Sequence, residues 1–248
     1  MQKRILQETY TLSNGTQIPK LGLGTWFIPD GQAAEAVRNA VELGYRLIDT
    51  AQAYENEAGI GEGVQSCGIP REEIFVTSKI AAEAKSYETA GKVKAIGVSI
   101  FLKDDLENIL EGCRVKPMVN QILFHISNTN LDLIDFCKEK DILVEAYSPI
   151  AHEEALKNEE ITGMAEKYGV SHAALCIRYV IQLGAIALPK TGNPVHMKEN
   201  ADLNFVIEDA DMEILKPQAD HLRQSFWQFG QDKNGNIMKL TGGGEVWH

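Results

Sequence analysis

The stretch YRLIDTAQAYENEAGIGEGVQSCGIPREEIFVTSK, residues 45–79, carries the pattern that decides the fold. Its two apolar runs, 45–51 and 73–79, predict buried strands, and the segment 56–68 between them predicts a helix. Strands that are apolar along their length and alternate with helices are typical of a parallel sheet covered by helices. The stretch therefore predicts a strand–helix–strand unit of an α/β protein.

The same alternation continues along the chain, after a hairpin signal at Asn14–Gly15. No break in composition divides the sequence, so we expect a single domain over residues 1–248. The predicted strands are 21–25, 46–50, 74–78, 95–99, 118–122, 142–147 and 185–189. The further predicted helices are 32–44, 103–112, 131–140, helices within 159–183, 194–201 and 209–216.

Two α/β folds fit this order, an open doubly wound sheet and a closed (β/α)8 barrel of the TIM type. The first strand-to-helix turn of a dinucleotide-binding open sheet would carry GxGxxG, and LGLGTWFIPDG, residues 21–31, does not. Polar residues follow the strands where a barrel has its active-site rim, which favours the barrel. These residues are Thr25, Asp49, Lys79, Ser99, Gln121, Tyr147 and Lys190.

The barrel that the sequence predicts is one strand short. Only residues 80–94 separate the third predicted strand from the fourth. Parallel strands need a connection of roughly a dozen residues, so this segment can hold one crossover but not a helix, a strand and a second helix. We therefore predict seven parallel strands, one βα unit fewer than eight, and a mobile or irregular segment at 80–94.

Composition limits the classes of function. Lys and Arg number 24 against 35 Asp and Glu, for a net charge of −11, which argues against nucleic acid or an anionic membrane as partner. No stretch has the length of a membrane span or of a signal-peptide core, so we expect a cytoplasmic protein. The four cysteines form no CxxC pair, which predicts reduced thiols and no metal site. They are Cys67, Cys113, Cys137 and Cys176.

Several motifs in order resemble the aldo-keto reductase family over most of the chain. They are GTQIPKLGLGTW, LIDTAQAYENE, REEIFVTSK, GKVKAIGVS, VNQI, EAYSP and LPKTGNPVHMKEN. The resemblance implies an eight-stranded (β/α) barrel that reduces carbonyl compounds with NADPH. It places three of the four catalytic residues at Asp49, Tyr54 and Lys79.

The chain departs from the family in two places. The catalytic histidine of the family ends its fourth strand, which is the part that this sequence lacks, and His125 follows a later strand and does not replace it. Ile100 stands where the family has an asparagine that helps to hold the nicotinamide carboxamide. Both departures affect the substrate and nicotinamide side of the pocket.

Carbonyl reduction by hydride needs a proton donor at the oxygen, and an isolated tyrosine with a pKa of about 10 is a reluctant one. A lysine cation lowers that pKa, and an aspartate keeps the lysine charged and oriented. Tyr54, Lys79 and Asp49 supply these groups. The alternative interpretation is a structural Asp–Lys ion pair beside an ordinary packed tyrosine.

The resemblance also implies the cofactor and substrate residues. Tyr147 would stack on the nicotinamide, or else be plain core, and Ser99 and Gln121 would bind its carboxamide, or else satisfy loop backbone. A helix start at 193–194 suits the adenosine phosphate, although it is also what a solvated helix start looks like. The full cofactor set is Thr25, Ser99, Gln121, Tyr147, Ser148, Lys190, Thr191, Lys198 and Asn200, and the aromatic residues that would line the substrate mouth are Trp26, Trp227 and Trp247.

Three functions remain open from the sequence. The first is an NADPH-dependent reductase of small aldehydes or ketones, monomeric or weakly dimeric. The second is a shortened, NADP(H)-binding but catalytically impaired member of the same family, because of the missing histidine and Ile100. The third is a lyase that uses Lys79 as a Schiff-base amine.

Overall fold

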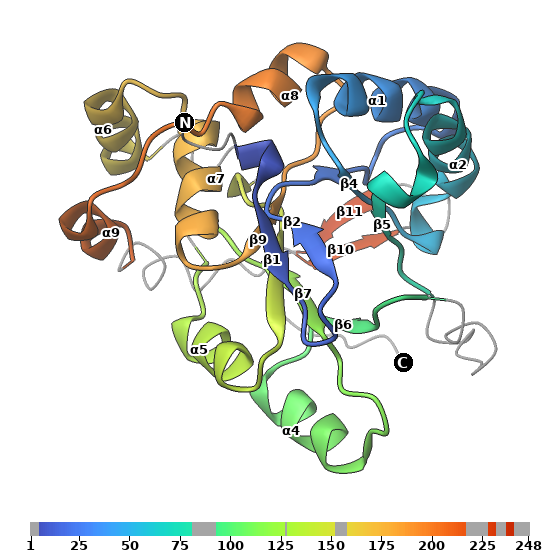
Figure 1. Cartoon of the computed structure of the whole chain (residues 1–248). Coiled ribbons are helices and arrows are strands. Elements are labelled where there is room, and N and C mark those ends of the chain that lie inside the picture. Colours follow the sequence, from blue (N-terminus) through green and yellow to red (C-terminus); the bar gives the residue numbers. More distant parts are fainter. Residues whose placement is uncertain are drawn as a thin grey trace.

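A computed structural model of the chain describes residues 5–80, 93–126, 128–151, 158–216, 228–231 and 237–240, with the strands inside and most helices around them (Figure 1). In this part of the chain, seven strands are parallel. They form a sheet of order β3-β4-β5 and a sheet of order β6-β7-β8-β9. Their bounds are β3 (Leu23–Gly24), β4 (Leu47–Asp49), β5 (Phe75–Thr77), β6 (Gly97–Ser99), β7 (Val119–Leu123), β8 (Leu143–Tyr147) and β9 (Ile186–Leu188).

The two sheets meet along β3 and β9. Parallel bridges join Leu21 to Ala187 and Gly24 to Lys190, and the amide of Gly24 donates to the carbonyl of Pro189 at 3.1 Å. A Cβ on Gly24 would lie 2.8 Å from the Leu188 carbonyl oxygen, so glycine permits this close approach. The seven strands therefore run as one curved series from β5 to β6.

The ends of this series do not pair with each other among the residues that the structure describes. Inside the series, β3, β4 and β9 are fully buried and β7 and β8 are buried except at their end residues. At the ends of the series, β5 is half-buried throughout and β6 is exposed at two of its three residues. An α/β barrel of the (β/α)8 type with seven parallel strands in its described part agrees with the predicted fold class. The prediction of a mobile or irregular 80–94 segment falls mostly on residues 81–92, which lie outside the described residues.

Most helices lie where their periodicity predicts them. The segment 159–183 holds two, because Gly169 ends the first in a left-handed conformation (φ 64°) and the Ser171 side chain caps the second. The helices are α1 (Asp30–Leu43), α2 (Glu57–Ser66), α4 (Lys103–Gly112), α5 (Leu131–Glu139), α6 (Glu159–Tyr168), α7 (His172–Gln182), α8 (Pro194–Ala201) and α9 (Asp209–Leu215), with 3-10 turns η1 (Ile5–Gln7), η2 (Gln52–Tyr54) and η3 (Arg71–Glu73).

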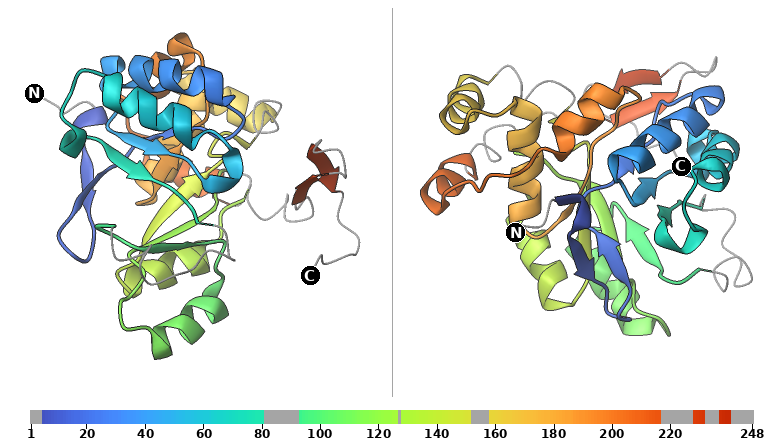
Figure 2. Two further views of the ribbon diagram at one scale, coloured as in Figure 1. Left: turned by 90° about the vertical axis from the view of Figure 1, so that its right-hand side faces the viewer. Right: turned by 45° about the horizontal axis from the view of Figure 1, so that its top comes forward.

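Helices α1 and α2 pack closely beside the strands β4 and β5 (Figure 2). A Cβ on Gly59 would lie 2.2 Å from the carbonyl oxygen of Asp30, and one on Gly63 would lie 2.7 Å from Cβ of Val37. Only glycine fits such contacts without displacing backbone. This packing fixes the start of α2 and, with it, the turn η2 that leads out of β4.

Two hairpins accompany the barrel strands. In the first, β1 (Thr9–Thr11) and β2 (Gln17–Pro19) confirm the predicted hairpin, but the loop has three residues instead of two. Only Gly15 takes a positive φ, of 84°, whereas a two-residue Asn–Gly turn needs positive φ at both positions. The second hairpin, β10 (Gln228–Gln231) with β11 (Ile237–Leu240), has no counterpart among the predicted elements.

No helix in the described ranges is long and apolar enough to cross a membrane.

Candidate active site

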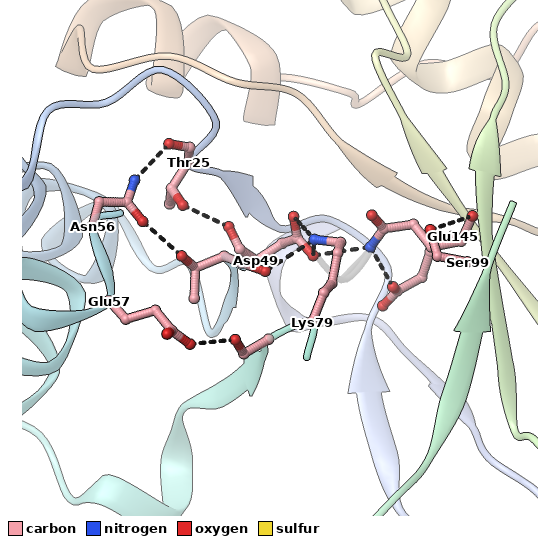
Figure 3. A network of polar contacts seen from close by, with 10 residues as sticks. Thr25, Asp49, Asn56, Glu57, Lys79, Ser99 and Glu145 are labelled. Carbon is pink, nitrogen blue, oxygen red and sulfur yellow. Dashed lines mark hydrogen bonds and ion pairs between the residues drawn. The ribbon is translucent and has the colours of Figure 1, made fainter. Parts of the chain in front are cut away.

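The centre of the site is a buried ion pair at the carboxyl ends of two neighbouring strands (Figure 3). Asp49 ends β4, and Lys79 follows β5. The Lys79 Nζ donates to both carboxylate oxygens of Asp49, at 2.7 and 2.9 Å, and to the Thr50 carbonyl at 2.9 Å. Burial acts to lower the pKa of Lys79, but the negative charge and hydrogen bonds of Asp49, with a smaller contribution from Tyr54, raise it above its ordinary value. Lys79 is therefore a cation throughout the neutral range.

Tyr54 lies against this cation. It ends η2, and the Lys79 Nζ is 4.9 Å from the centre of its ring. Burial raises the pKa of the Tyr54 phenol, and the Lys79 charge and hydrogen bond act in the opposite direction without reversing the rise. From the sequence we expect Lys79 to make this phenol more acidic; Lys79 does act in that direction, but the desolvation of the phenol outweighs it. Tyr54 is thus held in its protonated, donor form at neutral pH.

Two further polar side chains extend the cluster into the barrel. Gln121, on β7, donates its Nε2 to Asp49 Oδ1 and to Glu145 Oε2, at 2.9 Å each. Glu145 lies on β8 directly opposite Gln121 in the strand register and is 1% exposed. The predicted carboxamide ligand Gln121 therefore uses both amide hydrogens on protein carboxylates and keeps only its oxygen for another partner.

A buried asparagine holds the loops that carry the site. Asn56 donates to the carbonyls of Thr25 and Ile28, at 2.9 and 3.0 Å, and accepts from the Thr50 hydroxyl at 2.7 Å. The hydroxyl of Thr25 in turn donates to the Asp49 carbonyl at 2.9 Å. The Asn56 side chain thus fixes the loops after β3 and β4 relative to each other. The turn η2, which carries Tyr54, lies along the chain between Thr50 and Asn56.

The remaining predicted residues on the nicotinamide side lie at the same ends of the strands. Tyr147 ends β8; burial raises the pKa of its phenol, and the neighbouring phenol of Tyr54, once ionised at high pH, adds to this. Ser148 follows in a left-handed conformation with φ 51°. The Ser99 hydroxyl, at the end of β6, donates to the backbone carbonyl of Gln121 at 3.1 Å. Of the aromatic set, Trp26 has its ring centre 6.4 Å from that of Tyr54, whereas Trp227 and Trp247 lie outside the described residues.

The predicted phosphate-binding residues lie on both sides of the start of α8 along the chain: Lys190 and Thr191 precede the helix, and Lys198 and Asn200 belong to its second half. Lys190 and Lys198 are exposed, whereas Thr191 and Asn200 are buried. The Asn193 side chain caps α8 by accepting from the Val195 amide at 2.9 Å. A capped helix start preceded by the exposed cation Lys190 is a surface that fits a phosphate group, whereas Lys198 lies in the last turn of the helix.

Ile100 stands on the rim in a strained conformation. Its φ is 61°, a left-handed value that β-branched residues rarely adopt, and its side chain is 66% exposed. Asparagine, which the family has here, tolerates this conformation.

Replacing Ile100 with asparagine is therefore expected to raise the free energy of unfolding by about 1 kcal/mol, because it relieves strain and costs little buried area. Urea unfolding measures this change. The matched control is Ile100→Val, which keeps the β-branch and should bring no such gain. Equal stabilisation by both substitutions would show that the strain is not the cause.

Sequence reasoning missed Glu145 and Asn56. Glu145 occupies a buried, inward position of the strand LVEAY. Nothing in the neighbouring sequence marks it as a site residue, except that its carboxyl group interrupts an apolar run. Asn56 lies in the motif LIDTAQAYENE, but its bonds reach loops that only the folded chain brings together. Among the described residues, no group of His, Cys, Asp and Glu could hold a metal ion.

Comparison with known proteins identifies the family. The sequence profile of the Aldo/keto reductase family matches residues 20–90 and 81–218. Glyoxal reductase of Bacillus subtilis is 35% identical over 254 aligned positions, which cover 85% of this chain and 92% of the relative. Because that alignment has more positions than the whole chain has residues, part of the relative has no counterpart here.

Two other relatives agree. Glycerol 2-dehydrogenase (NADP(+)) of Saccharomyces cerevisiae is 31% identical over 277 positions, covering 83% of this chain and 88% of that protein. The crystal structure of an aldo/keto reductase from Brucella melitensis superposes with a TM-score of 0.80 at 31% identity, covering 85% of this chain and 99% of that one.

The fold, the cluster at its rim and these relatives define a barrel oxidoreductase. The chain belongs to the aldo/keto reductase family.

Proposed function

We propose that the chain is an NADPH-dependent reductase that converts aldehydes or ketones to alcohols. The observation that carries this proposal is the position of Lys79, which binds both oxygens of Asp49 and lies 4.9 Å from the ring centre of Tyr54. This is the arrangement that proton donation from a phenol to a carbonyl oxygen requires.

The chain's own residues perform the acid chemistry. Tyr54, protonated at neutral pH, donates its hydroxyl proton to the carbonyl oxygen as negative charge develops there. Lys79 stabilises the resulting phenolate, and Asp49 keeps the Lys79 ammonium charged and oriented. Bound NADPH would supply the hydride.

The residues present fit such a cofactor at both ends. Near its nicotinamide, Thr25, Ser99, Gln121, Tyr147 and Ser148 would lie around the ring and its carboxamide; their positions at the strand ends support this. At the phosphate end, Lys190 and Thr191 precede the start of α8, where the cation and the helix dipole would favour the 2′-phosphate of NADPH. Lys198 and Asn200, farther along α8, would contact the rest of the adenosine end. The Trp26 ring beside Tyr54 would contact the carbonyl substrate.

The lyase alternative fits the site poorly. A Schiff-base lysine attacks as a neutral amine, which requires a lowered pKa. The pKa of Lys79 is instead raised by its buried contact with Asp49.

The impaired-enzyme alternative rests on a specific observation. Among the described strands, β5 and β6 are the two ends of the series and do not pair with each other. The fourth strand of the family, which carries the catalytic histidine, belongs between them. Loss of a group that orients the carbonyl would lower the rate and would leave cofactor binding intact.

Two measurements separate these functions. NADPH oxidation is followed with glyoxal and 4-nitrobenzaldehyde as substrates, and NADPH binding is followed by protein fluorescence. We expect binding together with steady oxidation and formation of the alcohol. Binding without oxidation of NADPH by either aldehyde would reject the reductase in favour of the impaired alternative.

A further inference from the structure

Glu145 is a buried acid that the proposed mechanism does not use. It lies on the inward face of β8, opposite Gln121 on β7 and Ile186 on β9 in the strand register, and it is 1% exposed. One of its oxygens, Oε2, accepts the 2.9 Å hydrogen bond from Gln121, and the other, Oε1, is buried with no hydrogen-bond partner among the described residues. An ionised carboxylate would leave that oxygen uncompensated, at a large desolvation cost.

The neighbouring charges explain which form Glu145 takes. Asp49 and Lys79 already balance each other, so an ionised Glu145 would give the buried cluster a net negative charge. Burial raises the pKa of Glu145 to about 7, and the Asp49 charge adds to this, while Gln121 and Lys79 act in the opposite direction. Helix α5 contacts β8, and its buried titratable group is the Cys137 thiol, whose pKa burial also raises, so the thiol remains neutral in the same range. The other titratable residues of α5, Asp132, Asp135, Lys138 and Glu139, are exposed.

Gln121 couples Glu145 to the catalytic pair. Its single amide nitrogen donates to Asp49 and to Glu145, so that each carboxyl group fixes the orientation of the amide toward the other. Two acids that share one donor cannot both ionise at low cost. The protonation of Glu145 therefore sets the field at Asp49, Lys79 and the phenol of Tyr54.

We propose that Glu145 is a positioning residue of this site, which as a neutral acid holds Gln121 against Asp49. Loss of its proton to solvent gives the cluster a net negative charge beside Lys79 and Tyr54. This inference rests on the proposed reductase activity for its effect on rate, but the charge change itself does not depend on that activity.

The charge change has a defined consequence for the reaction. A negative charge in the cluster disfavours the phenolate of Tyr54, so the phenol donates its proton less readily once Glu145 is ionised. With an intermediate dependence of rate on acidity, raising the phenol pKa by about one unit lowers kcat for reduction by about threefold. We therefore expect kcat to fall by that factor between pH 6 and pH 8.

The test compares the wild type with Glu145→Gln. Glutamine keeps the shape and the hydrogen-bond acceptor of a neutral glutamic acid but cannot ionise. Its kcat should stay flat from pH 6 to pH 8, at the value that the wild type has at pH 6. The control is Glu139→Gln, which removes the same charge from an exposed residue of α5 and should retain the wild-type profile.

Infrared spectroscopy reads the proton of Glu145 without any turnover. The wild type and Glu139→Gln should show the carbonyl band of a buried protonated carboxyl at pH 6 that disappears by pH 8.5, and Glu145→Gln should lack this band. A titrating band that persists in Glu145→Gln, or no such band in the wild type, would overturn the proposal. The wild-type titration stands even if Glu145→Gln does not fold.

Kinetic outcomes discriminate further. A flat kcat profile in the wild type, or an unchanged fall in Glu145→Gln, rejects the coupling to Tyr54. The expected infrared result together with no turnover in any of the proteins would reject the proposed function and leave the charge state of Glu145 supported.

Discussion

Replacing Tyr54 by phenylalanine is expected to lower kcat for carbonyl reduction by about 10²- to 10⁴-fold, the range that a positioned general acid contributes. The substitution removes the hydroxyl and keeps the ring that packs near Lys79 and Trp26. NADPH affinity should change little, because no proposed contact to the cofactor uses this hydroxyl. Steady-state kinetics and a fluorescence titration with NADPH measure the two effects separately.

A matched control removes a tyrosine hydroxyl elsewhere. Tyr10, in the first hairpin, donates its hydroxyl to the Ile181 carbonyl at 3.0 Å, away from the cluster. Tyr10→Phe should keep kcat within about twofold, since it leaves the charges at the site unchanged. If Tyr54→Phe were as active as this control, the phenol would not be the proton donor.

The fold could be predicted from the sequence because its signals are local and repeated. Continuous apolar strands, helical periodicity and a glycine at the end of α1 each act within a few residues, and Gly44 indeed ends that helix with φ 104°. The seven-strand count followed from the short distance between β5 and β6 along the chain. Strand ends differed by a residue or two, which is the usual uncertainty of element boundaries.

The site could be predicted only in part. The motifs placed Asp49, Tyr54 and Lys79, and the structure brings all three together. The direction of the Tyr54 pKa could not be predicted, because it depends on how much desolvation the folded site imposes. The connection from Asp49 through Gln121 to Glu145 crosses three strands, and strand register is a property of the assembled sheet.

Replacing Lys79 by methionine is expected to cost about 3–5 kcal/mol of unfolding free energy at pH 8, as breaking a buried ion pair does. Lys79 is 24% exposed and Asp49 only 5% along their side chains, so solvent screens the pair weakly. The variant leaves the carboxyl groups of Asp49 and Glu145 buried around Gln121 with no cation from Lys79. Urea unfolding of both proteins at pH 5 and pH 8 measures the loss.

The loss should be smaller at pH 5, and the sign follows from proton binding. Without Lys79, the pKa values of Asp49 and Glu145 are raised further in the folded state. At any pH between the ordinary pKa of these groups and their raised pKa, the folded protein therefore binds more protons than the unfolded chain. Stability then falls as pH rises through this window, which opens at about pH 4. Lys103→Met, which removes a half-exposed cation 4.0 Å from Glu107, should cost less than about 1 kcal/mol at either pH. An equal loss at pH 5 and pH 8 in Lys79→Met would mean that lost packing, and not the uncompensated charge of Asp49, destabilises the variant.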